Sequence, residues 1–235
     1  MMDRIILIET STALCSAALV EDGRIVSVRK SSEPRAHASL TAPFVREMLN
    51  ERGLAVHDCN AVCVSKGPGS YTGLRVGVST AKGLCFGAHL PLISVGTLDT
   101  LVWQALDRNL LPDSCRYIVP MIDARRMEVY TGVFTPDAVQ VVPTVSRVVD
   151  GKTFDRQLSE GPVLFIGDGA EKCKAVIESP NAHFVSCCPE AAAMLHPALK
   201  AFRAKKFEDL AYFEPFYLKE FIATVSNKSL TKQIS

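Results

Sequence analysis

The sequence predicts an α/β protein with a mixed sheet, and three observations support that class. Three strand-like segments follow one another at the N-terminus with only tight turns between them, which requires an antiparallel meander. From residue 37 the apolar spacing changes to a helical period, and helices then alternate with strands, which produces parallel crossovers. A similar order of elements begins again in the second half of the chain.

The first half opens with a buried strand, because Ile5–Ile8 is an uninterrupted apolar run. The pair Asp22-Gly23 predicts a hairpin turn. The expected strands are 4–10, 14–20, 25–29, 59–65 and 92–95. The expected helices are 37–52, whose apolar residues recur at i, i+4 and which Gly53 ends, and 72–87.

The second half repeats this order of elements, although not the residues themselves. The expected strands are 117–123, 128–134, 139–149 and 163–166, and the expected helices are 98–109, 170–178 and 190–205. Beyond about Lys219 the chain is rich in small polar residues, and we expect a loosely ordered tail.

Composition restricts the class of protein. A chain of 235 residues with 48% hydrophobic and 22% charged residues is typical of a globular protein with a sizeable core, which excludes a disordered adaptor or a fibrous repeat. The 26 basic and 25 acidic residues give a net charge of +1. A protein that binds nucleic acid unaided usually carries a basic excess, so direct binding is disfavoured.

The N-terminus and the cysteines indicate a cytoplasmic protein. The apolar run Ile5–Ile8 lies between charged residues and is too short for a secretory signal, so the eight cysteines are expected to stay reduced. The uncharged stretch Gly83–Leu98 is broken by Pro91 and is shorter than the roughly 18–20 residues of a membrane-spanning helix. We expect no contact with a membrane.

The segment from Gly67 to Arg75 is the densest local signal. Glycines between a strand and a helix permit a tight backbone whose N–H groups can bind an anion. The segment is no Walker A loop, because no Gly-Lys-Ser/Thr follows, and its glycine interval differs from the dinucleotide-binding motif. Taken alone, the pattern favours a structural turn over an anion site.

The helix after this segment has few strong helix formers. Each internal glycine weakens a helix by roughly 0.8–1.0 kcal/mol relative to alanine, so close packing must hold this one. The packing partner is either the rest of its own domain or another subunit, and these alternatives are about equally favoured. The candidate contact residues on this helix and the preceding one are Leu40, Phe44, Met48, Gly73, Leu74, Gly77, Val78 and Ala81.

Two polar turns follow strands and are candidates for binding a nucleotide phosphate or magnesium. A carboxylate in such a turn can bind the ion, although a hydroxyl-rich structural turn is the commoner case. The candidate residues are Glu9, Thr10 and Ser11 in the first turn, and Gly167, Asp168 and Gly169 in the second.

Metal and nucleophile sites are not predicted. The five histidines include no i, i+4 pair, and Thr41 lies where a second histidine would complete such a pair with His37. The adjacent Cys187 and Cys188 lack the usual spacing of zinc ligands. No Gly-x-Ser-x-Gly motif is present. We expect no catalytic residues, no metal and no cofactor.

Several segments together resemble the TsaB (YeaZ) family, which supports threonylcarbamoyladenosine synthesis on bacterial tRNA. These segments are Ile6–Thr12, Cys15–Val20, Gly67–Gly77, Ala81–Gly83, Ser94–Leu98, Asp123–Arg125, Gly167–Gly169 and Pro215–Leu218. The resemblance covers nearly the whole chain, and Gly67–Gly77 is its most specific part. The family usually has aspartate where this chain has Glu9.

The resemblance implies an actin-like, sugar-kinase-type (ASKHA) fold with two related subdomains, 1–96 and 97–218, followed by the tail 219–235. It implies a subunit without its own catalysis that pairs with the catalytic subunit TsaD through the first two helices. It also implies action with the ATPase TsaE, a homodimer when the protein is alone, and only indirect contact with tRNA. The competing hypotheses are an ATP-dependent small-molecule kinase of the same fold and, third, a metalloprotease.

Overall fold

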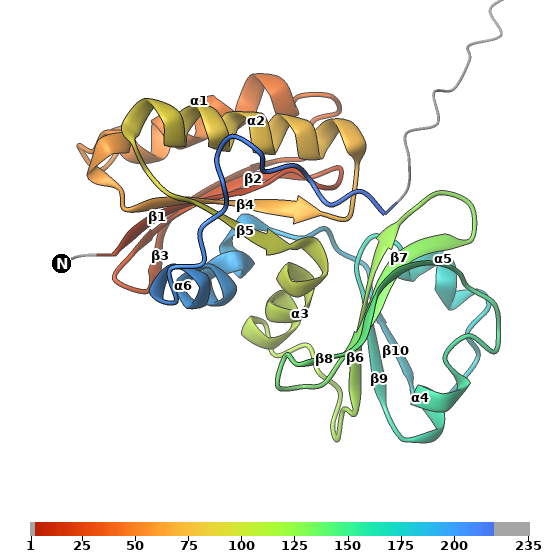
Figure 1. The fold of residues 1–235 in the computed structure, drawn as a ribbon. Coiled ribbons are helices and arrows are strands. Elements are labelled where there is room, and N and C mark those ends of the chain that lie inside the picture. The colour runs from red at the N-terminus through yellow and green to blue at the C-terminus, as the bar shows by residue number, and fades with distance from the viewer. Residues whose placement is uncertain (1–2, 219–235) are drawn as a thin grey trace, which may run out of the picture.

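The first half of the chain forms a five-stranded mixed sheet in the computed structural model, which describes residues 3–218 (Figure 1). Its order is β3-β2-β1-β4-β5. The meander β1–β2–β3 is antiparallel, whereas β4 and β5 run parallel to β1. The strands are β1 (Arg4–Glu9), β2 (Cys15–Glu21), β3 (Arg24–Ser31), β4 (Ala61–Gly67) and β5 (Leu92–Gly96).

The second half forms a second five-stranded mixed sheet of order β10-β9-β6-β7-β8. Here β6, β7 and β8 form the antiparallel meander, and β9 and β10 extend the other side in parallel. The strands are β6 (Tyr117–Asp123), β7 (Glu128–Phe134), β8 (Gln140–Val148), β9 (Val163–Ile166) and β10 (Ala182–Val185). The same topology therefore occurs twice, which confirms the predicted α/β class with two related mixed-sheet subdomains.

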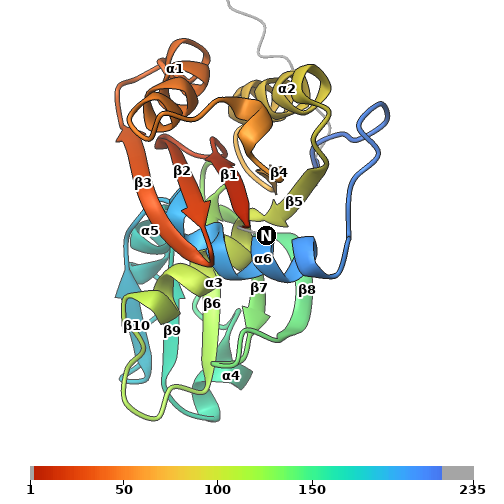
Figure 2. The same ribbon diagram turned by 90° about the vertical axis from the view of Figure 1, so that its left-hand side faces the viewer.

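Helices cover both faces of each sheet (Figures 1 and 2). Helices α1 and α2 cover the outer face of the first sheet, α3 and α6 lie between the sheets, and α4 and α5 cover the far face of the second sheet. The α-helices are α1 (His37–Asn50), α2 (Tyr71–Ala88), α3 (Thr97–Asp107), α4 (Asp155–Ser159), α5 (Ala170–Lys174) and α6 (Leu195–Arg203). Two short 3-10 helices are η1 (Val56–Asp58) and η2 (Ala191–Met194).

The end of the described chain returns to the first subdomain, which corrects the expected division at residue 97. Met194 and Ala198 are fully buried against Ile5 and Leu7 of the first sheet. Residues 207–218 then pass along β5 and α2, where Glu208 N donates to Leu92 O (2.9 Å). The first subdomain is thus built from both ends of the chain, because η2 and α6 supply the apolar surface that closes one face of its sheet. The expected tail, 219–235, lies outside the described residues.

Two expected helices differ from the structure, and two elements were not expected. The helix expected over 170–178 ends at Lys174, and the helix expected over 190–205 is divided into η2 and α6. Strand β10 and helix α4 were not expected, because segments of four and five residues are too short to show a period. Within residues 3–218, no helix is long and apolar enough to cross a membrane.

Candidate functional site

The segment from Gly67 to Gly77 packs directly on the turn that follows β1. Ser70 N donates to Ser11 O (2.7 Å), and Thr10 Oγ1 donates to Gly73 O (2.8 Å). A Cβ atom on Gly73 would lie 2.1 Å from Thr10 O, and one on Gly77 would lie 2.2 Å from Thr10 Oγ1. The two motifs therefore form one packed unit in which α2 requires glycine on the side that faces β1.

Glu9 is the fully buried centre of this unit. Its Oε1 accepts a hydrogen bond from Ser11 N (2.6 Å), and its burial raises the pKa of the carboxyl above the usual value. Glu9 Oε2, Ser11 Oγ and Thr12 Oγ1 have no hydrogen-bond partner among the described residues. The turn thus directs its carboxyl into the core, so of the two alternatives Glu9, Thr10 and Ser11 form a structural turn and not an open phosphate or magnesium site.

His37 and Thr41 have structural partners of their own at the start of α1. His37 Nε2 is 2.9 Å from Thr12 O, and Thr41 Oγ1 donates to His37 O (2.7 Å). Thr41 is fully buried and lies 3.5 Å from Cys15 Sγ. No group of three potential metal-ligating side chains is found within residues 3–218.

The second candidate turn, Gly167–Gly169, is closed around Asp168. Asp168 Oδ1 accepts from Asp123 N (2.9 Å), while the Asp123 carboxylate pairs with Lys172. Burial raises the pKa of Asp168, and the charge of Asp123 adds to this effect. Gly167 has φ +132°, and a Cβ on it would lie 2.1 Å from Met121 O, so glycine is required there.

The Cys188 thiol is affected by both candidate turns. Burial raises the pKa of its thiol, and the carboxyls of Asp168 and Glu9 both contribute in the same direction. The carboxyls of both turns therefore act on the same thiol. Glu9, Thr10 and Ser11 of the first turn are all buried, whereas the Asp168 side chain of the second turn is partly exposed.

The candidate contact residues of α1 and α2 lie mostly on the inner faces of these helices. Met48, Leu74 and Ala81 are fully buried, and Val78 is 5% exposed. Phe44, Gly73 and Gly77 are buried as well, and only Leu40 is partly exposed. The apolar stripe identified from the sequence is therefore part of the core of the first subdomain, so of the two alternatives the packing partner of these candidate contact residues is their own domain.

The outer surface of α2 carries different residues. Phe86 is 77% exposed, and a Cβ on Gly83 or Gly87 would have no atom within 4 Å. Thr72, Arg75 and Ser79 are also exposed on this helix, and Ala38 and Ala42 are exposed on α1. We call the set Ala38, Ala42, Thr72, Arg75, Ser79, Gly83, Phe86 and Gly87 the outer α1–α2 surface.

A cluster at the start of α2 was missed by sequence reasoning. Tyr71 and Tyr217 have ring centroids 4.8 Å apart, and the Arg75 guanidinium lies 4.2 Å from the centre of the Tyr71 ring. Arg75 Nε also donates to Tyr217 OH (3.3 Å). No local pattern could relate Arg75 to Tyr217, because 142 residues separate them. The one available signal was that Gly67–Gly77 and Pro215–Leu218 both belong to the segments that resemble the TsaB family.

Comparison with known proteins gives matches over most of the chain. The family model described as "TsaD: tRNA N6-adenosine threonylcarbamoyltransferase" matches residues 30–226. The tRNA threonylcarbamoyladenosine biosynthesis protein TsaB of Escherichia coli (strain K12) is 39% identical over 134 residues, which are 57% of this chain and 56% of that protein. The protein of the same name from Bacillus subtilis (strain 168) is 32% identical over 177 residues, 74% of this chain and 75% of that protein.

A solved structure extends the similarity to nearly the full length. YeaZ from Pseudomonas aeruginosa superposes with a TM-score of 0.79 at 26% identity, covering 92% of this chain and 100% of that one. The sequence match with the Escherichia coli relative, in contrast, spans only a little over half of that protein.

Proposed function

The chain belongs to the TsaB family, and from this premise we propose that it is a subunit without its own catalysis in the synthesis of threonylcarbamoyladenosine on tRNA. It pairs with a TsaD-type catalytic subunit, acts with TsaE in the cytoplasm, and reaches tRNA only through these partners. When alone it forms a homodimer through the same surface.

The observation that carries this proposal is the outer α1–α2 surface. Phe86 is a large apolar side chain left 77% exposed, and it lies beside two glycines whose surroundings are open. Burying a phenylalanine stabilises a contact by roughly 1.5–3 kcal/mol, and glycines allow a partner helix to approach closely. Because the inner face of α2 is already packed, a partner subunit can contact this helix only on the outer face.

The buried turn after β1 supports a role without catalysis. A catalytic or phosphate-binding carboxylate must reach its substrate, yet Glu9 is fully buried and Asp123 is paired with Lys172. An ATP-dependent small-molecule kinase would need both turns to open toward a nucleotide. We therefore expect no ATP hydrolysis by the purified chain, and turnover that disappears in the Asp123→Ala variant would favour the kinase hypothesis.

The subunit contact can be tested by substituting Phe86 with glutamate. Calorimetry with the TsaD protein of the same organism should show at least a tenfold loss of affinity, since a buried aromatic is a typical hot spot. The matched control is Val141→Glu, which changes an exposed apolar residue of β8 in the other subdomain and should leave the affinity within about twofold. Circular dichroism checks that both variants are folded. A folded Phe86→Glu protein that binds TsaD with undiminished affinity contradicts the proposal.

A further inference from the structure

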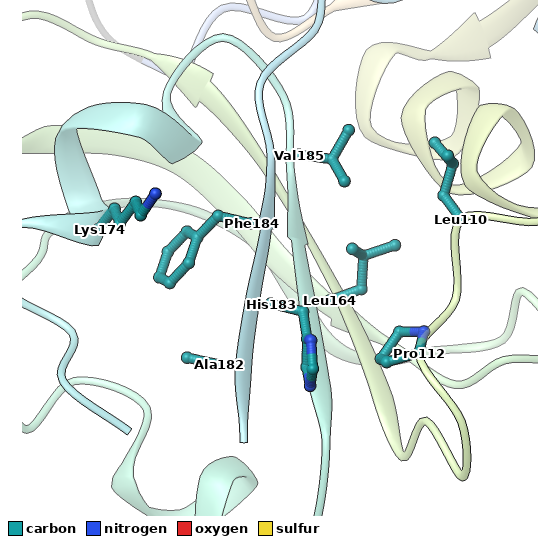
Figure 3. A pocket seen from close by; sticks show the side chains of 8 residues that line it. All are labelled: Leu110, Pro112, Leu164, Lys174, Ala182, His183, Phe184 and Val185. Atoms are coloured by element: carbon teal, nitrogen blue, oxygen red, sulfur yellow. The ribbon is translucent and has the colours of Figure 1, made fainter. Parts of the chain in front are cut away.

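The proposed function does not use the free edge of β10. Strand β10 is the terminal strand of the second sheet, and among residues 3–218 its one paired strand is β9. A hollow of about 420 Å³ lies against this strand (Figure 3). Its lining residues are Leu110, Pro112, Leu164, Lys174, Ala182, His183, Phe184 and Val185. We call this region the β10 groove.

The backbone of Phe184 faces the open side of the strand. Val163 N donates to Asn181 O (2.8 Å) and Gly167 N donates to Val185 O (3.1 Å), so residues 181 and 185 direct their backbone groups toward β9. The direction of the backbone N–H and C=O groups alternates from one residue to the next along a strand, and Phe184 lies next to Val185 in the part of β10 that is in register with β9. The N–H and C=O of Phe184 therefore both face the groove, where an added strand can accept and donate one hydrogen bond each.

The two sides of the groove differ in chemistry. Figure 3 shows Leu110, Pro112 and Val185 on one side of β10 and Lys174 and Phe184 on the other. The side chains of an added strand would point alternately to these two sides. One set of positions would contact an apolar wall, and the other set would lie beside the ammonium group of Lys174.

Charge restricts the partner further. Lys174 has no ion pair or hydrogen bond with any residue of the described chain, and no carboxylate lines the groove. A second copy of this chain that paired β10 with β10 would bring two Lys174 side chains to the same face, which like-charge repulsion disfavours. An acidic side chain at the same position would be attracted instead.

We propose that the β10 groove binds an extended segment of a partner protein in which apolar and acidic residues alternate, and that this segment adds as a sixth strand beside β10. This mode of recognition uses main-chain hydrogen bonds for affinity and alternate side-chain contacts for specificity. The groove lies in the second subdomain, whereas the outer α1–α2 surface belongs to the first. The proposal therefore does not depend on pairing with TsaD.

The test uses the full chain and a blocked nine-residue peptide that alternates valine and glutamate. Hydrogen exchange is measured at the Phe184 amide, and at a peptide concentration ten times the Kd this exchange should slow about tenfold. The Lys174→Glu variant should bind this peptide about fivefold more weakly and should prefer a valine–lysine peptide. Lys174 is exposed, so this variant is expected to fold. The control Lys152→Glu changes the net charge equally at an exposed position and should bind as the original chain does.

Three results would overturn the proposal. The first is no slowing at Phe184 with up to about 1 mM peptide. The second is that the original chain binds the valine–glutamate and valine–lysine peptides equally and that Lys174→Glu changes neither affinity, which would show that the groove does not select acidic residues. The third is slowing at Phe184 that rises with protein concentration in the absence of peptide, which would assign the edge to a second copy of this chain.

Discussion

The two halves of helix α2 place the same residue type in opposite surroundings. A Cβ on Gly73 or Gly77 would lie within 2.2 Å of Thr10, whereas a Cβ on Gly83 or Gly87 would have no atom within 4 Å. The first pair is needed because the turn after β1 approaches the helix closely. Within residues 3–218 the second pair has no neighbour that requires glycine, so the weakened helix there is consistent with a surface that binds a partner.

This contrast separates two interpretations that the sequence left equally favoured. Small residues along a helix indicate a close neighbour, but they do not say whether it comes from the same chain or another. In α2 the crowded and the open surroundings both occur within five turns of the same helix, since it spans 18 residues. The N-terminal half of α2, with Gly73 and Gly77, packs on its own domain, and we call it the inner half. We propose that the C-terminal half, with Gly83 and Gly87, binds another subunit, and we call it the outer half.

The largest expected effect comes from charge on the inner face. Val78→Asp places an unpaired carboxylate in the core of the first subdomain, where Val78 is 5% exposed. The free energy of unfolding should fall by more than about 4 kcal/mol, and circular dichroism should show an unfolded chain. Phe86→Asp, on the outer face, should change stability by less than about 0.5 kcal/mol. A well-folded Val78→Asp protein would show that the two faces have been misassigned.

The next effect is steric and concerns Gly73→Ala. The added methyl group would meet the backbone oxygen of Thr10 at 2.1 Å, so the turn or the helix must shift. Overpacking of this kind destabilises by about 1–3 kcal/mol and outweighs the roughly 0.8–1.0 kcal/mol gain in helix propensity. Urea unfolding should show a lower midpoint with an unchanged slope. An increase in the midpoint would mean that the close approach of Thr10 is not rigid.

The matched substitution on the outer half, Gly83→Ala, should have the opposite sign. Its methyl group meets no atom within 4 Å, so the helix gains propensity without strain. We expect stabilisation of about 0.4–1 kcal/mol, measured by the same urea titration. Affinity for TsaD should fall in the same variant if a partner helix approaches here. A destabilised Gly83→Ala protein would remove the contrast between the two halves.

The smallest effect concerns the pH dependence of the turn on which the inner half packs. Because burial raises the pKa of Glu9, the folded state binds more protons than the unfolded state above the ordinary carboxyl pKa. The Glu9 contribution to stability is therefore fully present below that pKa and is lost as the pH rises through the folded value. Glu9→Gln should gain melting temperature relative to the original chain at pH 7.5 compared with pH 5.

The control for this experiment is Glu171→Gln, an exposed carboxyl in α5 whose substitution should leave the pH dependence unchanged. An identical melting-temperature difference between Glu9→Gln and the original chain at both pH values would show that Glu9 is not held in a desolvated state.

The candidate site was predicted only in part. The sequence identified both polar turns and the segment Gly67–Gly77, and in the structure the carboxyls of both turns raise the pKa of the Cys188 thiol. The direction of the Glu9 carboxyl could not be predicted, because a turn after a buried strand can face either the core or solvent. The contact of Arg75 with Tyr217 was also out of reach, since no local pattern relates residues 142 positions apart.

The sequence by itself determined the order of the longer elements, the two meanders and the class of sheet, because apolar period and turn residues act over a few neighbouring positions. It also carried the motifs that relate the chain to the TsaB family. Only the tertiary structure decided which face of α2 is buried, that η2 and α6 complete the first subdomain, and that β10 ends the second sheet with a free edge. The physical reason is that burial depends on which distant surfaces meet. Thr10 and Gly73 show this most directly, because nothing in the sequence near either residue indicates the other, yet they are hydrogen-bonded and a Cβ on Gly73 would collide with the Thr10 carbonyl oxygen.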